Sequence, residues 1–558
     1  MSTTRPAPPE RPAPRAPWGG TLPYLAISLL TAALYRRVAT LWWLSDDFFH
    51  FHLLTKHPAT SFFFSPRSGR DLPGRMFTPL LLLSLRADWR LFGLRPGPFH
   101  LHQLAAIGAA ALLLHATLRL WMAPSSALFG ATLFLFGTTV GPVAAELATR
   151  HYAEGLGLAL LSTIFFVRGE RTRSPAFIAA SAVLYLLAMS AKEIFVPLPA
   201  ILALLPETRG RLRTLRAHAA ALAAYPVWRI AVLGTLVGGY GLVLPAKRAL
   251  PALAGLPFRL TAAIFGPGGG AGWATLAGLA VLWAMAPPRS GREWAFVAVL
   301  LAAAVLPVLP VSSELAPRYA LATWIALACL AAASLERARR FRRRTAAAAA
   351  LVTLALAFLS HRTAWGAAGA RLRRQSAENR AFATRLVSGD VLVHPASYPA
   401  AMGELSWFRQ DVLRSHGRPD WFFDDLRLLE HPPLGSGNRY WEYDASADSC
   451  RDVTGTMPAR ARLAARLDRP SAPLTARFEW RPGALRWRLG PYPDGGYAFV
   501  LRDGADAMAV PAEGAYRLDP QPITLRVKYA AISGWTTYSS GIVIDPTRAA
   551  SVSWERRP

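Results

Sequence analysis

Residues 101–121 read LHQLAAIGAAALLLHATLRLW and contain one arginine and no carboxylate. A stretch of about 20 predominantly apolar residues is long enough to cross the hydrocarbon core of a bilayer as a helix. Comparable apolar runs recur at 176–191 and 230–244. The sequence therefore predicts helices that span a membrane.

The composition of the whole chain agrees with these runs. Of 558 residues, 53% are hydrophobic and 17% are charged, whereas soluble domains are about 25% charged. This excludes a soluble enzyme with one large core. The net charge of +28 lies in short gaps between apolar runs, which is typical of membrane topology signals and not of a polar nucleic-acid-binding domain. With only Cys329 and Cys450 present, we expect no disulfide framework and no thiol-ligated metal site.

The N-terminal part divides into a tail and a first span. Residues 1–19 are rich in Pro, Ala and Arg and are predicted to form a disordered basic tail. The apolar run at 22–44 is too long for a signal-peptide core and lacks a small-residue cleavage site before Asp46 and Asp47, so it is predicted to be retained.

Arginine clusters in the gaps predict the orientation, because cytoplasmic loops carry the excess of Lys and Arg. With the N-terminus inside, the clusters at 168–173, 209–216, 289–292 and 337–344 all fall on the cytoplasmic side. About eleven spans result, near 22–44, 100–121, 126–145, 153–168, 175–191, 194–208, 222–243, 258–285, 294–312, 319–335 and 345–361. The run at 77–94 carries Arg86, Asp88 and Arg90 and could lie in the interface or form a further span. A twelfth span there would invert everything after it, and the arginine pattern argues against that.

The predicted fold class is therefore mainly α, a polytopic membrane helix bundle over 20–361 with a first external loop at 45–76. Residues 362–558 follow as an extracytoplasmic α/β or β-rich domain. From about 440 onward, aromatic and β-branched residues alternate with polar ones, as at 475–480, 485–489 and 523–529, which favours strands. Four aromatic residues could line a carbohydrate platform or, alternatively, belong to the core or the membrane interface: Trp407, Trp421, Phe422 and Phe423.

Charged side chains at membrane depth are functional candidates. In the predicted topology a set of them lies at the outer ends of spans, and it comprises Asp46, Asp47, Arg75, Glu146, Arg150, Lys192, Glu193, Glu314 and Arg318. Simpler readings exist: Glu146 and Arg150 have the i, i+4 spacing of a helix-surface ion pair, as do Glu314 and Arg318, and the aspartates could only begin a solvated loop. Arg229 and the pair at 36–37 fall inside expected spans without an assigned role.

This set suits transfer from a lipid-linked phosphate. A carboxylate can deprotonate an acceptor hydroxyl, while nearby cations neutralise a phosphate leaving group. The chain uses lysine at four positions and arginine at 58, so Lys192 suggests a need for a compact ammonium. The glycine-rich run at 266–270 lacks a strand-to-helix context and a P-loop lysine, which argues against a nucleotide site.

Several short motifs resemble the GT-C superfamily of membrane glycosyltransferases, in particular protein O-mannosyltransferases and the transmembrane O-mannosyltransferases with tetratricopeptide repeats. The matching stretches are the aspartates after the first span, RMFTPL at 75–80, LFGLRPGPFH at 91–100, ELATR at 146–150, SAKE at 190–193 and PRY at 317–319. They occur in the family's order over about residues 20–335. The repeats are absent here, and Met76, Phe77 and Thr78 interrupt the family's Arg-Pro pair after Arg75.

The resemblance implies an inverting transfer from a polyprenyl-phosphate sugar, with Asp46 or Asp47 as the catalytic base and Asp46 preferred. It implies donor-phosphate ligands among Arg75, Arg150, Lys192 and Arg318, and positioning roles for Glu146 and Glu193. No metal site is assigned, although a divalent cation is compatible with the superfamily.

The sequence thus predicts a hexosyl- or pentosyltransferase of the cytoplasmic membrane that acts on a hydroxyl of a protein, glycan or lipid at the outer face. Two alternatives remain open. A flippase or transporter for lipid-linked sugars would show internal repeats and charges near the bilayer midplane. A non-catalytic envelope scaffold would tolerate replacement of Asp46 and Asp47.

Overall fold

The computed structural model describes residues 20–236, 255–266, 270–311, 315–397, 399–417, 419–422, 437–467, 472–482, 484–492, 495–501, 506–516, 522–532 and 535–555. The expected tail at 1–19 lies outside them. The chain forms two compact units. The helical unit comprises Met1–Leu41 and His57–Ala368, and the C-terminal unit comprises Trp42–Lys56 and Gly369–Pro558.

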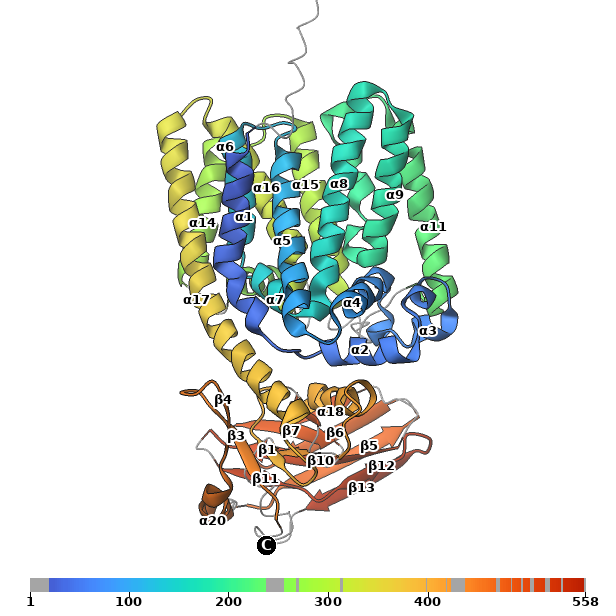
Figure 1. The fold of residues 1–558 in the computed structure, drawn as a ribbon, viewed down its shortest axis with the longest axis vertical. Coiled ribbons are helices and arrows are strands. Elements are labelled where there is room, and N and C mark those ends of the chain that lie inside the picture. Colours follow the sequence, from blue (N-terminus) through green and yellow to red (C-terminus); the bar gives the residue numbers. More distant parts are fainter. Residues whose placement is uncertain are drawn as a thin grey trace, which may run out of the picture. The chain divides into compact units, whose positions relative to one another are not determined.

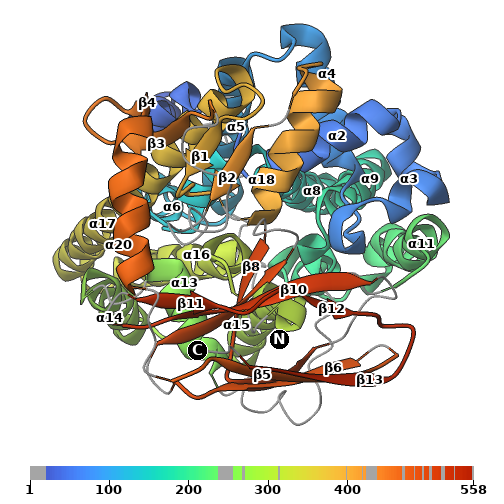
Figure 2. The same cartoon turned by 90° about the horizontal axis from the view of Figure 1, so that it is seen from below.

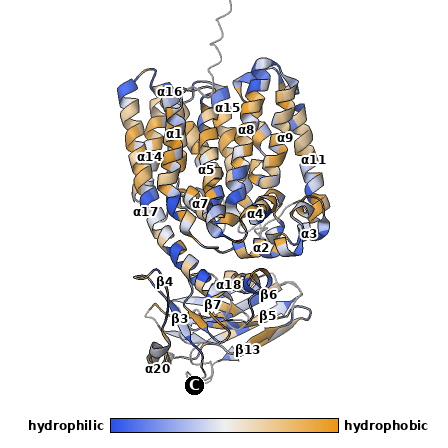
Figure 3. Cartoon of the chain, viewed as in Figure 1, coloured by the Kyte–Doolittle hydropathy of each residue, from blue (hydrophilic) through white to orange (hydrophobic). Residues whose placement is uncertain are grey.

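Helices make up most of the helical unit, and the longer ones run side by side (Figure 1). Their bounds are α1 Leu22–Tyr35, α4 Pro79–Phe92, α5 Pro96–Leu118, α6 Pro124–Leu135, α7 Val140–Ala145, α8 Arg150–Thr172, α9 Pro175–Ala191, α10 Leu198–Ala203, α11 Arg216–Leu233, α13 Leu256–Phe265, α14 Gly270–Met285, α15 Gly291–Val305, α16 Leu321–Ala338 and α17 Arg343–Thr384. Figure 3 shows apolar residues along the helices and hydrophilic ones gathered at their ends. This pattern is that of a bundle with an apolar surround.

Local sequence signals set where these helices begin and end. Proline occupies the first turn of α4, α5, α6 and α9, where its missing N–H costs no hydrogen bond. The Ser174 side chain accepts a hydrogen bond from the Phe177 N–H at the start of α9. At the end of α11, Gly234 adopts a left-handed conformation with φ of 71°, a common C-terminal stop.

In the described part of the chain, four helices are long and apolar enough to cross a membrane, or five if the bent pair α13 and α14 counts as one span. The four are Pro96–Leu118, Gly291–Leu309, Pro317–Ala338 and Arg343–Thr384. The predicted membrane helix bundle is confirmed in kind, while the number eleven remains a prediction. Shorter apolar helices at Pro124–Leu135, Pro175–Ala191 and Glu193–Ala203 account for part of the difference.

Several predicted span boundaries differ from the structure. The span predicted at 126–145 is divided between α6 and α7. The span predicted at 22–44 ends as an α-helix at Tyr35 and continues as a 3₁₀ turn over Arg36–Thr40. The span predicted at 345–361 is the first part of a helix of 42 residues that reaches Thr384. Polarity changes near residue 361, but the following Ala, Arg, Gln and Glu residues are strong helix formers. The loss of hydrophobicity therefore ends the apolar run and not the helix.

Close packing between the short helix α3 (Pro66–Arg70) and α11 depends on a glycine. A Cβ added to Gly69 would lie 2.4 Å from Cγ1 of Val232 and 2.6 Å from its carbonyl oxygen. Because backbone atoms block the space, we expect Gly69→Ala to destabilise the protein by about 1–3 kcal/mol, seen as a lower melting temperature of the purified protein. Gly366, within α17, has nothing within 4 Å, so Gly366→Ala should instead stabilise by about 0.5–1 kcal/mol. Equal melting temperatures of the two variants would contradict this packing.

The region predicted as the first external loop, 45–76, is mostly helical. It contains α2 (Asp47–Lys56), α3 and 3₁₀ turns at Ala59–Phe63 and Pro73–Arg75. By its contacts, the segment Trp42–Lys56 belongs to the C-terminal unit, whereas the rest of the expected loop, from His57 onward, belongs to the helical unit. The physical reason is an aromatic cluster, because Trp42, Phe48 and Phe51 all pack against Phe408.

The C-terminal unit contains a small mixed sheet and a β-sandwich. The mixed sheet has the order β2-β1-β3-β4 and accompanies helices α18 (Pro399–Trp407) and α20 (Met457–Leu467). Its strands are β1 Val391–Val393, β2 Asp420–Phe422, β3 Tyr440–Asp444 and β4 Ser449–Asp452. Most strands of this unit lie from Tyr440 onward, while β1 and β2 precede it.

The sandwich follows from the alternating pattern seen in the sequence. One layer has the order β13-β5-β6-β9 and the other β11-β10-β7-β8, with β12 also on β10; Figure 2 shows the two layers. Their strands are β5 Thr475–Arg481, β6 Ala484–Gly490, β7 Gly496–Leu501, β8 Asp506–Val510, β9 Glu513–Tyr516, β10 Ile523–Ala530, β11 Thr536–Tyr538, β12 Ile542–Ile544 and β13 Ala550–Glu555. Phe478 and Trp487 from one layer contact Phe499 from the other, so the inward residues form a single core.

Of the four aromatic residues that could line a carbohydrate platform, two belong to the core. Trp421 and Phe422 are buried, and Trp407 stacks on His52; Phe423 lies outside the described residues. The core alternative is therefore the one that holds for Trp421 and Phe422.

Candidate functional site

Five charged side chains from distant parts of the helical unit form two neighbouring groups of contacts. They are Lys192 and Glu193 after α9, Arg229 in α11, Glu146 after α7, and Arg318 in the 3₁₀ turn Pro317–Ala320. Glu193 contacts both Lys192 and Arg229, and Arg318 pairs with Glu146. The two groups lie near enough for the like charges of Lys192 and Arg318 to repel each other. The set contains three cations and two carboxylates.

Lys192 and Arg229 are the two buried cations of the set, whereas Arg318 is partly exposed. Lys192 is 6% exposed, and its backbone leaves the helix in an extended conformation. Its ammonium lies 3.1 Å from the Met76 sulfur, 3.8 Å from the Glu193 Oε2 atom and 5.5 Å from the centre of the Tyr152 ring. An ammonium has three donors, and a thioether is a weak acceptor. A buried ammonium with so few acceptors favours the approach of an anion.

Glu193 holds neighbouring segments in place. Its Oε1 atom accepts hydrogen bonds from the Phe77 N–H at 2.9 Å and from the Arg229 guanidinium. Arg229 also donates to the carbonyl oxygen of Arg75 at 3.0 Å. Together, Glu193 and Arg229 fix the backbone on either side of Met76, whose sulfur contacts Lys192.

Arg229 is a member of this cluster that sequence reasoning left without a role. The available signal was its charge inside an apolar run. What could not be read from the sequence is its partner, since Glu193 lies 36 positions away on another segment.

Arg75 itself is exposed and has a left-handed φ of 50°. Among the described residues, none forms a hydrogen bond or ion pair with its guanidinium. Only its carbonyl oxygen joins the cluster, so a role for its side chain as a phosphate ligand stays a prediction.

Glu146 pairs with Arg318 and not with Arg150, the partner that the sequence spacing suggested. Glu146 does not pair with Arg150 at the i, i+4 spacing; it accepts a hydrogen bond from Arg318 at 3.0 Å. The chain is extended at Glu146 between α7 and the next turn, which takes its side chain away from that of Arg150. Glu314, the other suggested partner of Arg318, lies outside the described residues.

Arg150 belongs to a separate buried network. It is fully buried, and its guanidinium donates to Asp88, Gln103, Ser84 and the carbonyl oxygen of Phe99 at 2.5 to 3.1 Å. These acceptors occupy its donors and tie α4, α5 and α8 together. The arrangement therefore favours a structural role for Arg150 over the predicted role as a phosphate ligand.

Removing one charge of this network is expected to be costly. Asp88→Asn leaves the Arg150 guanidinium buried without its counter-ion, which typically costs about 3–5 kcal/mol. We expect a large drop in melting temperature and in yield. Asp390→Asn is a milder counterpart, because its partner Arg439 is half-exposed; a similar loss in both variants would argue against the network.

In the C-terminal unit, the two candidate bases have different environments. The Asp47 side chain is buried, and its Oδ2 atom accepts a hydrogen bond from the Leu44 N–H at 2.9 Å. Asp46 is half-buried, and its carbonyl oxygen accepts hydrogen bonds from the N–H and Nδ1 of His50. Asp47 thus supports the turn that starts α2.

Further bonds hold this segment inside the C-terminal unit. Ser376 accepts from the Trp42 N–H at 2.8 Å, and Asn379 donates to the carbonyl oxygen of Trp43 at 3.1 Å. His52 lies 3.0 Å from Asp411. Burial, with the nearby charge of Lys56, lowers the pKa of His52 against the opposing effect of Asp411, which favours the neutral imidazole.

No group of three or more His, Cys, Asp or Glu side chains within the described ranges is arranged to hold a metal ion.

Comparison with known proteins found no matching family model and no matching curated protein. Among solved structures, the chain is similar to ArnT from Cupriavidus metallidurans bound to undecaprenyl phosphate, with 15% identity and a TM-score of 0.41 over 76% of this chain and 93% of that one. It is also similar to an oligosaccharyltransferase from Archaeoglobus fulgidus tethered with an acceptor peptide, with 13% identity and a TM-score of 0.42 over 73% of this chain and 64% of that one. These are similarities of overall fold, and no residue role is transferred from either protein.

Proposed function

We propose that this protein is a membrane glycosyltransferase of the GT-C type. It transfers a hexose or pentose from a polyprenyl-phosphate donor to a hydroxyl of a protein, glycan or lipid, with inversion at the anomeric carbon. The reaction takes place at the outer face of the cytoplasmic membrane, with the N-terminus inside and the C-terminal unit outside. The order of the GT-C-like motifs along the sequence supports the family.

The observation that carries the proposal is the environment of Lys192. A buried ammonium with a weak sulfur acceptor and a carboxylate oxygen 3.8 Å away is suited to a strongly charged oxygen anion. The leaving group of the proposed reaction is a polyprenyl phosphate, which gains negative charge as the bond to the sugar breaks. Cations placed before the reaction stabilise such charge most effectively when water is excluded.

Arg229 and Arg318 complete the phosphate site in this proposal. Arg229 is 4% exposed in its side chain and Arg318 is 25% exposed. Each is held by one carboxylate, Glu193 or Glu146, which acts as a positioning residue. The cluster keeps a net charge of one positive unit before the donor arrives.

The acceptor hydroxyl needs a base, and we assign this role to Asp46. Asp46 is preferred because it matches the first acidic position of the pair that follows the first span in the GT-C families, and its side chain is half-buried. Positioned general bases typically contribute about 10²–10⁴-fold to the rate.

The proposed function is tested by comparing two classes of sugar donor. Membranes with the full chain are supplied with a radiolabelled sugar either as a polyprenyl-phosphate sugar or as a nucleotide sugar, in a host that lacks polyprenyl-phosphate-sugar synthesis. We expect label in an acid-precipitable or lipid-extractable acceptor from the first donor only. Equal labelling from the nucleotide sugar would contradict the proposal.

The same membranes distinguish the flippase alternative. A flippase would move the intact polyprenyl-phosphate sugar across sealed vesicles and leave the phosphate-sugar bond unbroken. Recovery of all label as intact donor, with changed sidedness, would replace the transferase by a transporter.

A further inference from the structure

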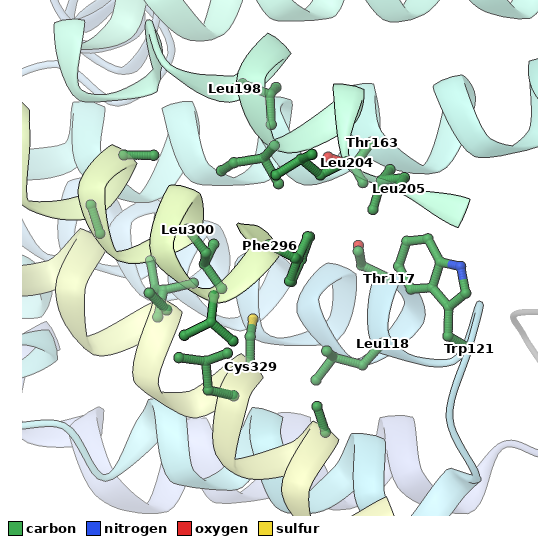
Figure 4. A pocket seen from close by; sticks show the side chains of 18 of the residues that line it. Thr117, Leu118, Trp121, Thr163, Leu198, Leu204, Leu205, Phe296, Leu300 and Cys329 are labelled. Carbon is green, nitrogen blue, oxygen red and sulfur yellow. The ribbon is translucent and has the colours of Figure 1, made fainter. Parts of the chain in front are cut away.

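A second feature of the helical unit has no role in the proposed transfer. A cavity of about 660 Å³ lies between α5, α8, α10, α15 and α16. Figure 4 shows Leu118, Leu204, Phe296, Leu300 and Cys329 pointing into the same space. The volume is within the range of about 300–1,000 Å³ that is common for ligand sites, and the walls are mostly aliphatic and aromatic.

The cavity is elongated along the helices. On α16 its lining runs from Ala322 to Arg337, which corresponds to about 22 Å of helix. One end is lined by Ile194, directly after Glu193, and the other by Arg337 and its neighbours. It therefore extends over much of the roughly 30 Å thickness of a bilayer core.

The end remote from Lys192 is strongly basic. Four arginines line it, namely Arg209, Arg292, Arg337 and Arg340, against the single carboxylate of Glu293. Arg292 donates to the carbonyl oxygen of Leu205 at 2.7 Å and Arg337 to that of Ala286 at 3.0 Å. Both guanidiniums are thus held in position by backbone carbonyl oxygens.

Arg209 and Arg340 are exposed, and no described residue accepts a hydrogen bond from either guanidinium. The N-terminus of α15 also lies at this end, with Ser290 in the lining, and its dipole adds positive potential. Trp121, at the same end, is of the type enriched at membrane interfaces. An apolar cavity with several cationic side chains at one end matches a molecule with an anionic head and apolar tails.

We propose that this cavity binds an anionic phospholipid, with its acyl chains among the aliphatic walls and its phosphate between Arg209 and Arg340. The donor of the proposed reaction fits less well. Its phosphate would lie near Lys192 at the opposite end, and its hydrocarbon tail has no charged group that could pair with the four arginines. The inference does not depend on the transferase activity.

The test measures binding of phosphatidylglycerol to the purified full chain in detergent by native mass spectrometry. We expect phosphatidylglycerol to bind at least roughly tenfold more tightly than phosphatidylcholine, and Arg209→Gln/Arg340→Gln to remove most of this preference. The matched control is Arg213→Gln/Arg342→Gln, which takes the same charge from the same two segments at exposed residues outside the cavity lining. This control should bind like the wild type.

A second variant tests the tail. Ala333 is half-buried and lines the cavity, so Ala333→Trp fills it and should abolish binding without changing the charge. An equal loss of phosphatidylglycerol binding in the arginine control, or unchanged binding in Ala333→Trp, would contradict binding in the cavity. Nonspecific attraction to surface charge would then explain the preference. Displacement of the lipid by inorganic phosphate alone, or by polyprenyl phosphate at equal concentration, would overturn the assignment in favour of a free anion or of the donor.

Discussion

Asp46→Asn is expected to lower the rate of sugar transfer by about 10²–10⁴-fold, the usual contribution of a positioned general base. The change replaces a carboxylate by an amide of the same shape that cannot take up the proton of the acceptor hydroxyl. Initial rates with a saturating polyprenyl-phosphate sugar measure this loss. The fall should appear in kcat, with little change in KM for the donor, because Asp46 has no part in phosphate binding.

Two neighbouring carboxylates serve as controls for Asp46. Asp47→Asn keeps an oxygen that can accept the hydrogen bond from the Leu44 N–H, so we expect a smaller loss of rate. Asp411→Asn removes a carboxylate of the same unit whose partner is His52, and it should leave the rate near that of the wild type. If Asp47→Asn abolished transfer while Asp46→Asn did not, the base would be Asp47.

Lys192→Met is expected to lower the rate by about 10²–10³-fold, the cost of one oriented donor to a developing oxyanion. Methionine fills a similar volume and brings no buried charge, so the helical unit should keep its stability. Glu193 retains its bonds to Phe77 and Arg229, which preserves the surrounding backbone. The readouts are kcat for transfer and the melting temperature of the same preparation.

Matched lysine and arginine variants sharpen this result. Lys56→Met removes an exposed lysine at the end of α2 and should leave transfer unchanged. Lys192→Arg keeps the charge but replaces the compact ammonium by a larger planar group in a buried position, so we expect it to remain impaired. Normal activity of Lys192→Met would contradict the proposal that Lys192 binds the donor phosphate.

Much of the architecture could be predicted from local sequence patterns. Apolar runs predicted the helices at 101–121 and 176–191, and alternation predicted strands that correspond to β5, β6 and β10. These features depend on residues close together in the chain. The extension of α17 to Thr384 was missed because hydrophobicity indicates where a membrane ends and not where a helix ends.

The partners within the site could not be predicted in the same way. The sequence brought Glu146, Lys192, Glu193 and Arg318 forward as candidates, but the pairs Glu146–Arg318 and Glu193–Arg229 join segments 172 and 36 positions apart. The spacing of Glu146 and Arg150 suggested a helical pair, yet the chain is extended at Glu146. Such pairings are set by tertiary packing, which a single sequence does not contain.

The proposed mechanism is tested by transfer of radiolabelled sugar from a polyprenyl-phosphate donor by purified protein in liposomes, comparing the wild type with Asp46→Asn/Asp47→Asn. Protein level and melting temperature are matched between the two samples. We predict label in the acceptor with the wild type and none above background with the double variant. Label moving equally well in both would contradict a catalytic base in this segment and, with it, the proposed mechanism.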